Sequence, residues 1–513
     1  GHGTCVALDT CSCELYHSGE QCEKNVFGLL FSVGSNSKGQ LGDDYYDDRL
    51  IPEMTVYPLT HGKFVKLVAA GQDVSFALTT DGELYSWGQG KKVSNSITSM
   101  SLLGDGALVD RNRPVRIMNS FAPVTHVCVG ALHVVVSTID NRVYTWGLNT
   151  VDESMICQSS PLLNTVCPCA PANCPSKSGV LGNSSYYWTN TPIEVTRPSD
   201  NFMGESIVEL ACGTKHTLLR TSGGRIYGWG VNTQNQLGDI NYYGKYVLEP
   251  TLLQSDANRG ELLGDKRIIS IAAGDSFSMV LTDRGHVYVW GDNNRGQAAD
   301  ATTNSARTKN ARLIRHFVHD RVSVSRISTG RQAAYVVTER NDLFAWGDNL
   351  NGQLGINSTT IAFVSTPVSI DIHNVSFLHS NVWSDSVIVA TSSGEFAWGG
   401  NLFGQLSLNG MEEKVRYPTR MYRVPNQQRE LVLGSVGLTH ALLVYNGTYC
   451  YGMLSDDENV CSGRGICADY NTCECFPMFY SFDCRETFCY GVSNFDRNVC
   501  SGGSNVLRYC INR

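Results

Sequence analysis

The stretch FALTTDGELYSWGQG, at residues 76–90, decides the fold of this chain. An apolar run leads into a two-residue turn at Asp81-Gly82, and an alternating run then ends in Trp87-Gly88. Period-two patterns on either side of a glycine-containing turn are typical of an antiparallel β-hairpin. The same setting returns with a tryptophan-glycine pair at Trp146, Trp229, Trp290, Trp346 and Trp398. Self-similarity of this kind indicates a repeat architecture.

Seven copies of this unit can be aligned between residues 26 and 448. The first, VFGLLFSVGSNSKGQLG at 26–42, has Val33 where the other copies have tryptophan. Several copies are followed by a second signature, which reads GQLG at 39–42 and 352–355 and NQLG at 235–238. A single unit cannot bury its own faces, so we expect the copies to stack on one another, either radially or in a line.

These units resemble the repeats of the regulator of chromosome condensation family, whose fold is a seven-bladed β-propeller. The resemblance spans about 420 residues and implies an all-β ring over 26–448. The copy at 26–42 supplies only the second half of a unit, and residues 430–447 supply only a first half. Joined in space, the N- and C-terminal strands would make one blade, so that seven blades close without free edges.

Two kinds of residue recur at fixed positions of the repeat. We interpret the six tryptophans (Trp87, Trp146, Trp229, Trp290, Trp346 and Trp398) as packing side chains between blades, with ligand stacking as the less favoured alternative. His133, His216 and His440 share another position, where the family resemblance implies a structural hydrogen-bonding role. Because these histidines belong to three separate blades, we do not expect them to bind one metal ion.

The composition excludes several classes of protein. The 513 residues include 40 basic and 48 acidic residues, and the net charge of −8 argues against a nucleic-acid-binding surface. No apolar run reaches the ~18–20 residues of a membrane span. Motifs of hydrolases and nucleotide-binding sites (GxSxG, HExxH, Walker loop) do not occur. The loops at 291–296 and 347–352 lack the glutamate that a calcium loop needs. We therefore predict a non-enzyme without cofactor or metal.

Cysteine usage indicates the compartment. Of the 19 cysteines, four lie in the first 22 residues and nine between Cys450 and Cys510. Such density in short segments is typical of disulfide-bonded modules of extracellular proteins. Zinc is the alternative, but the spacings are not repeated CxxC knuckles and lack histidine partners. Four N-glycosylation sequons, at Asn183, Asn357, Asn374 and Asn446, agree with a secreted glycoprotein.

Two cysteine-rich segments share one spacing. Cysteines at 467, 473, 475 and 484 repeat the intervals of those at 5, 11, 13 and 22. With Cys450 and Cys461 ahead of it, the later segment resembles an EGF-like module of the tenascin type. The resemblance implies the disulfides Cys450–Cys467, Cys461–Cys473 and Cys475–Cys484, and by the same pattern Cys13–Cys22 and Cys489–Cys510.

The resulting domain prediction has four parts: 1–25, the C-terminal part of an EGF-like module; 26–448, the propeller; 449–486, a complete EGF-like module; and 487–513, the start of a further one. The family pattern leaves Cys5, Cys11 and Cys500 without a partner inside their modules. Either the sequence is a window of a longer chain with more such modules on both sides, or a partial module is completed by another subunit in a head-to-tail polymer.

The six remaining cysteines lie within the repeat body. An insertion at about 149–180 carries Cys157, Cys167, Cys169 and Cys174 in a proline-rich context without hydrophobic periodicity. We interpret it as a disulfide-stapled loop, with a four-cysteine zinc site as the alternative. Cys128 and Cys212 occupy equivalent positions of neighbouring copies, and we expect them to pair across two blades. Because insertions of propellers often carry binding function, this loop is a candidate interaction site.

The function predicted from these features is that of a non-catalytic extracellular structural or adhesion protein. Chains of EGF-like modules resemble extracellular-matrix proteins and the mastigoneme (flagellar hair) proteins of protists. We therefore predict a subunit of a filament, flagellar hair or matrix, whose partners are further copies of itself or related EGF-like and propeller proteins.

The alternative is a receptor ectodomain or a secreted propeller that binds a ligand or glycan. Aromatic residues in the loops after the blades (Tyr45-Tyr46, Tyr186-Tyr187-Trp188 and Tyr242-Tyr243) would form its contact rim. Packing of these aromatic side chains on neighbouring blades is the structural alternative. A secreted enzyme that uses the propeller pocket has no motif in its support.

Overall fold

The computed structural model describes residues 28–446 except 56–63, 92–100, 119, 150–177, 185–187, 199, 239–243, 254–262, 265, 303–307, 409, 411 and 423–429, and except the side chains of 308 and 309. On either side it describes the backbone of short strands, between residues 3 and 25 and between 449 and 493. In the second of these segments it also describes the side chains of Ser462, Cys473, Cys475 and Cys484.

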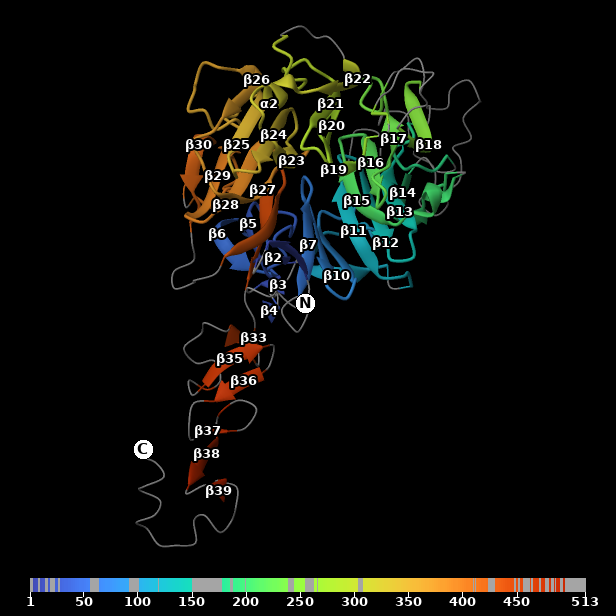
Figure 1. The fold of residues 1–513 in the computed structure, drawn as a ribbon. Helices are drawn as coiled ribbons and strands as arrows, with labels where there is room; N and C mark the ends of the chain where they lie inside the picture. Colours follow the sequence, from blue (N-terminus) through green and yellow to red (C-terminus); the bar gives the residue numbers. More distant parts are fainter. Residues whose placement is uncertain are drawn as a thin grey trace, which may run out of the picture.

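Seven four-stranded antiparallel sheets, here called blades 1 to 7, form a ring (Figure 1). Blades 1 to 6 each take four consecutive strands, from the innermost to the outermost: β7 (Val65–Ala70), β8 (Val74–Thr79), β9 (Leu84–Gly88), β10 (Arg111–Ile117); β11 (Val124–Val129), β12 (His133–Thr138), β13 (Val143–Leu148), β14 (Trp188–Glu194); β15 (Ile207–Cys212), β16 (His216–Thr221), β17 (Ile226–Val231), β18 (Tyr246–Leu252); β19 (Ile268–Ala273), β20 (Phe277–Thr282), β21 (Val287–Gly291), β22 (Thr308–Leu313); β23 (Val324–Thr329), β24 (Ala333–Thr338), β25 (Leu343–Asp348), β26 (Phe363–Ser369); β27 (Val375–His379), β28 (Ser386–Thr391), β29 (Gly394–Gly400), β30 (Lys414–Arg420). Two short helices lie between blades, η2 (Asn201–Gly204) and α2 (Arg315–His319).

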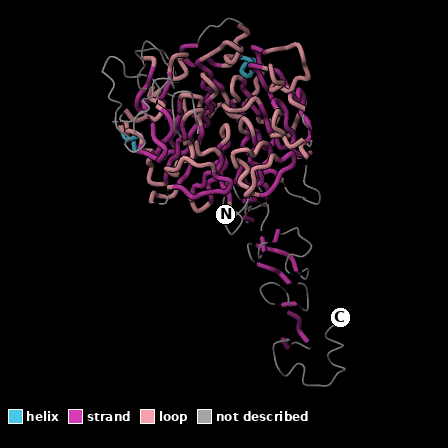
Figure 2. The backbone as a smooth tube through the Cα atoms, turned by 180° about the vertical axis from the view of Figure 1, so that it is seen from behind, coloured by secondary structure: helices cyan, strands magenta, loops and turns pink. Residues whose placement is uncertain are grey.

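Blade 7 joins the two ends of the propeller sequence. Its strand order is β31 (Leu431–Val436), β32 (His440–Asn446), β5 (Gly28–Gly34) and β6 (Arg49–Met54). β32 and β5 are antiparallel, with the register running from His440 opposite Gly34 to Asn446 opposite Gly28. The predicted all-β, seven-bladed ring closed by strands from both ends is therefore confirmed. Figure 2 shows the ring from behind, built almost entirely of strands and loops.

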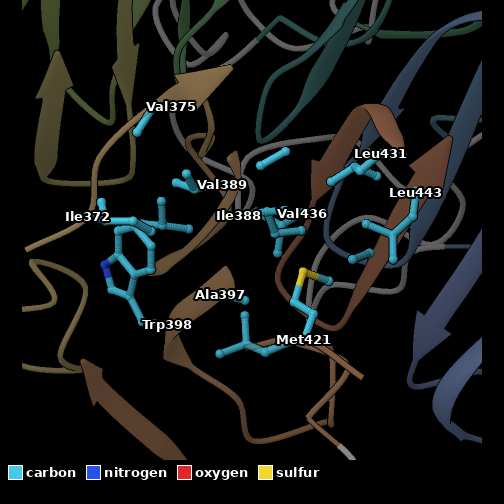
Figure 3. Close-up of a cluster of buried hydrophobic side chains, with 14 of the residues drawn as sticks. Ile372, Val375, Ile388, Val389, Ala397, Trp398, Met421, Leu431, Val436 and Leu443 are labelled. Carbon is cyan, nitrogen blue, oxygen red and sulfur yellow. The ribbon is translucent and has the colours of Figure 1, made fainter. Parts of the chain in front are cut away.

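The second strand of a blade is the most buried, because neighbouring blades cover both of its faces. In β8, β12, β20 and β24 every residue is buried. A continuous apolar run is the pattern expected of a strand buried on both sides, and it replaces the alternation of half-buried strands. One buried cluster spans the last two blades, where Trp398, Ile388 and Val389 of blade 6 lie near Leu431 and Leu443 of blade 7 (Figure 3).

The two repeated signatures meet across each boundary between blades. All six repeated tryptophans are fully buried. The indole Nε1 of Trp87 donates to the carbonyl oxygen of Gln40, which belongs to the GQLG segment of the preceding blade, over 2.8 Å. A Cβ on Gly42 of the same segment would lie 2.7 Å from that nitrogen, so the final glycine makes room for the indole. Equivalent bonds of 2.6–2.9 Å follow for Trp146, Trp290, Trp346 and Trp398.

Short strands flank the ring. Before it come β1 (Gly3–Ala7), β2 (Thr10–Cys13), β3 (His17–Ser18) and β4 (Lys24–Asn25); after it come β33 (Tyr449–Cys450), β34 (Met453–Leu454), β35 (Gly465–Asp469), β36 (Thr472–Cys475), β37 (Phe479–Tyr480), β38 (Glu486–Cys489) and β39 (Val492–Ser493). β1 pairs with β2 in the same register as β35 with β36, since Gly3 faces Cys13 as Gly465 faces Cys475. The shared cysteine spacing thus corresponds to the same backbone hairpin at both ends.

Candidate functional site

The innermost strands of the seven blades surround a central channel of about 410 Å³. Its walls are mainly aliphatic or small, because each innermost strand presents residues such as Ala69, Ala211 and Ser435 there. Larger apolar side chains, Leu67, Phe377 and Leu433, lie along blades 1, 6 and 7. Within the part of the chain that the structure describes, this channel is the most extensive candidate for a binding site.

One end of the channel is closed by the loop between β27 and β28. In the other six blades the innermost and second strands are joined by three residues, whereas residues 380–385 make this connection six residues long. Asn381 Nδ2 donates to the carbonyl oxygen of Ala70 in blade 1 over 2.9 Å, and Trp383 Nε1 donates to that of Gly130 in blade 2 over 3.2 Å. Val382 is buried between them. We call this loop the cap.

The cap was not predicted, although the sequence contains a sign of it. Six copies begin this connection with glycine, at Gly71, Gly130, Gly213, Gly274, Gly330 and Gly437, whereas the sixth blade has HSNVWSDS at 379–386. The sequence shows that the turn is longer and has lost its glycine. It does not show that the extra residues cross the channel rather than extend into solvent.

A disulfide lies in the channel wall. Cys128, near the end of β11, is bonded to Cys212, at the end of β15, with Cα atoms 5.5 Å apart. The two strands are the innermost strands of blades 2 and 3, so the bond joins neighbouring blades covalently at the centre of the ring. The insertion cysteines (Cys157, Cys167, Cys169 and Cys174) lie outside the described residues.

The end of the channel opposite the cap carries polar side chains that connect blades. Glu209 of β15 accepts hydrogen bonds from Arg220 Nε over 2.6 Å, from Ser270 Oγ over 2.9 Å and from the Ile271 amide over 3.2 Å. The last two belong to blade 4. Burial raises the pKa of Glu209, and the Arg220 guanidinium partly offsets this shift. Arg326 of blade 5 likewise donates to the carbonyl oxygens of residues 375 and 376 in blade 6.

The three repeated histidines connect blades in pairs. His133 Nε2 lies 2.8 Å from Thr217 Oγ1, His216 Nε2 lies 3.1 Å from Ser278 Oγ, and His440 Nε2 lies 2.7 Å from Ser75 Oγ. In each case the hydroxyl belongs to the next blade of the ring. Burial lowers the pKa of each histidine to about 3, so all three are neutral near pH 7. The structure thus places them in separate pairs with hydroxyl groups.

Metal and membrane sites were also sought in the described residues. No group of three or more His, Cys, Asp or Glu side chains in them is arranged to hold a metal ion. Within the same residues no helix is long and apolar enough to cross a membrane.

Exposed apolar side chains gather on the face that carries the cap. Leu350 (50% exposed) and Leu402 (55%) follow the third strands of blades 5 and 6, and Tyr45 (58%) and Tyr46 (51%) occupy the equivalent loop of blade 7. We call these four residues the apolar patch. The aromatic contact rim predicted from the sequence is thus exposed at Tyr45 and Tyr46. Trp188 instead packs against the core of blades 1 and 2. Tyr186, Tyr187, Tyr242 and Tyr243 lie outside the described residues.

The four sequons differ in exposure. Asn357 and Asn374 are exposed, whereas Asn183 and Asn446 are half-buried. Asn183 Nδ2, the atom that would carry a glycan, donates to the carbonyl oxygen of Glu194 over 2.9 Å. Asn446 ends β32, and its side-chain oxygen accepts from the amide of Glu430 over 2.8 Å.

We expect glycans at Asn357 and Asn374 when the full chain is expressed in a secretory host. Intact mass should fall by one glycan for Asn357→Gln and for Asn374→Gln, because both amides are accessible. Asn183→Gln should leave the mass unchanged, since its amide is engaged in the folded loop. A glycan recovered on Asn183 would show that modification precedes folding of this loop.

In the EGF-like segment Cys475 is bonded to Cys484, with Cα atoms 5.3 Å apart. Cys473 is also in a disulfide. The other expected partners (Cys450, Cys461 and Cys467), and the side chains of Cys13, Cys22, Cys489 and Cys510, lie outside the described residues.

Comparison with known proteins agrees with this architecture. Regulator of chromosome condensation (RCC1) repeat models match residues 28–78, 65–92, 207–236, 223–281, 268–297 and 324–353. An EGF-like domain model matches residues 455–484. The body of the chain is therefore a seven-bladed propeller of RCC1 repeats, followed by an EGF-like segment.

Curated relatives share the repeats over part of their length. The ultraviolet-B receptor UVR8 of Arabidopsis thaliana is 29% identical over 331 residues, which cover 64% of this chain and 63% of UVR8. The mitochondrial RCC1 domain-containing protein RUG3 of the same plant is 26% identical over 312 residues, covering 55% and 64%. The chain thus spans somewhat less than two thirds of either relative.

Among solved structures, Prp20p from Saccharomyces cerevisiae has the same fold, with a TM-score of 0.64 and 18% identity over 84% of this chain and 93% of Prp20p. Its structure was described together with its binding to Gsp1p and histones. At this identity the likeness concerns the fold.

Proposed function

We propose that this chain is a non-catalytic, extracellular protein-binding propeller that assembles with further copies of itself into a filament, flagellar hair or matrix. The observation that carries the proposal is the Cys128–Cys212 disulfide at the centre of the ring. Structural disulfides form in oxidising compartments and are rare in the cytosol. The Cys475–Cys484 bond in the EGF-like segment supports the same compartment.

The apolar patch is the surface that we assign to assembly. Its residues occupy equivalent loops of three consecutive blades, and neighbouring loops are joined, since Lys414 of blade 6 donates to the carbonyl oxygen of Leu350 in blade 5. Exposed aromatic and leucine side chains that lie close together are typical of protein interfaces. Arg49 holds its guanidinium 5.3 Å from the ring centre of Tyr45, which orders that side chain before binding.

Sedimentation velocity of the secreted full chain tests this assignment. We expect concentration-dependent oligomers for the natural chain and a monomer for Leu402→Asp, because a carboxylate in the contact would be desolvated without a partner. Ile139→Asp is the matched control, since Ile139 is 69% exposed in a turn on the opposite face. Equal oligomer content in Leu402→Asp, or a monomer in the natural chain at tens of micromolar, would refute assembly through the patch.

Glycan or ligand binding by the same face is the second candidate, supported by the exposed Tyr45 and Tyr46. Aromatic rings that present a flat face to solvent are suited to sugar rings and to protein hot spots alike. Glycan-array binding that disappears in Tyr45→Ala, while sedimentation shows only monomer, would favour this candidate over assembly.

A further inference from the structure

We infer that the capped channel is a binding site for a small organic anion with an apolar body. This site is separate from the apolar patch, and it does not depend on assembly. Its volume of about 410 Å³ lies within the range of roughly 300–1,000 Å³ that is typical of small-molecule pockets.

The cap makes the channel a pocket with a floor. Without it, a central channel would be open at both ends, and a ligand would have contacts only with the walls. Asn381 and Trp383 hold the cap across the ring by hydrogen bonds to blades 1 and 2, and Val382 is buried beneath it. A ligand therefore enters from the opposite end and is enclosed on all other sides.

The walls determine the body of the ligand. Leu67, Phe377 and Leu433 supply an apolar surface on one side, whereas Ala69 and Ala211 leave the width of the channel open. Apolar surface that leaves water contributes about 25 cal/mol per Å² to binding. An aromatic or branched aliphatic body gains most from such walls.

The charge of the pocket determines its sign of preference. Lys66 is the single lysine, arginine, aspartate or glutamate that lines the channel. It makes no ion pair with any carboxylate among the described residues, so its ammonium group is available to a ligand. Glu209, near the same end, is already bound by Arg220 and Ser270. His379, which also lines the channel, stays neutral near pH 7 because burial lowers its pKa to about 4.

A matched pair of fluorescent probes separates the charge from the apolar body. The anion 8-anilinonaphthalene-1-sulfonate and the uncharged N-phenyl-1-naphthylamine share their ring system. We expect both probes to bind the full chain with a saturable site. Lys66→Met should weaken the sulfonate about tenfold, as loss of a charge-assisted contact does, and should leave the uncharged probe within about twofold.

Two further variants locate the site. Ala211→Phe should weaken both probes, because it fills the channel next to Phe377 and Leu433. Leu402→Asp should change neither, since it alters the apolar patch instead. Unchanged sulfonate binding in Lys66→Met would overturn the inference, as would an absence of saturable binding. If Ala211→Phe does not fold, as judged by its thermal midpoint, the Lys66→Met comparison between the two probes still decides.

Discussion

Lowering the pH from 7 to 5 is expected to destabilise the propeller by several kcal/mol. His133, His216 and His440 are neutral in the folded ring, where burial lowers the pKa of each to about 3. In the unfolded chain each titrates near its ordinary value of about 6.5. The unfolded state therefore binds more protons in this interval, and stability falls as the pH falls.

The size of the effect follows from the two pKa values. Each histidine removes about 2 kcal/mol of stability by pH 5. The loss begins as the pH drops below about 6.5 and is complete near 3, where the folded state begins to take up protons itself. Denaturant midpoints measured at several pH values give this slope directly.

A natural substitution provides the control for this experiment. Blade 4 has Phe277 at the position where three other blades have histidine, and Phe277 is fully buried. His216→Phe should therefore be tolerated and should reduce the pH dependence by about one third. His373→Gln should leave it unchanged, because His373 is exposed. If His216→Phe and the natural chain show the same slope between pH 7 and 5, buried histidine is not the cause.

Removal of the Cys128–Cys212 disulfide by the double substitution Cys128→Ala, Cys212→Ala is expected to cost about 2–5 kcal/mol. The bond closes a loop of 84 residues, which contains the rest of blade 2 and its insertion. Closing a loop of that length removes much conformational entropy from the unfolded chain, at about 4–5 kcal/mol in the chain-entropy model.

Comparison with a reducing agent distinguishes this bond from the others in the chain. The natural protein in dithiothreitol should lose at least as much stability as the double variant does without it. The double variant should lose little more on reduction, unless the EGF-like cysteines also stabilise the ring. A double variant as stable as the natural chain would show that hydrogen bonds alone hold blades 2 and 3 together at the centre.

The ring could be predicted from the sequence because its determinants recur. Trp87 and its five equivalents, the GQLG segments and the half units at both ends specify seven blades and the position of the closure, with Val33 at the joining strand. The contacts between Trp Nε1 and the carbonyl oxygens of the second signature explain why both signatures persist together. Features shared by every blade leave a periodic trace in the sequence.

Features that belong to one blade leave no such trace. Glu209 and Arg326 occupy the third position of their innermost strands, where other blades have Leu67, His126 or Phe377. No pattern therefore marks them as contacts between blades. Leu350 and Leu402 also resemble core residues by type, and only the structure shows that they are exposed. The cap depends on the direction taken by three additional residues, which composition does not determine.

The closure of blade 7 also determines how the ring bears mechanical tension. The flanking segments continue from Gly28 of β5 and from Asn446 of β32, and these two residues face each other at the same end of the strand pair. A force that separates the segments therefore acts across the hydrogen bonds and breaks them one after another, starting at Gly28. Strands pulled from opposite ends would share the load among all bonds at once. Blade 7 is thus the part of the ring that opens first under tension, and it protects the six remaining blades only until that point.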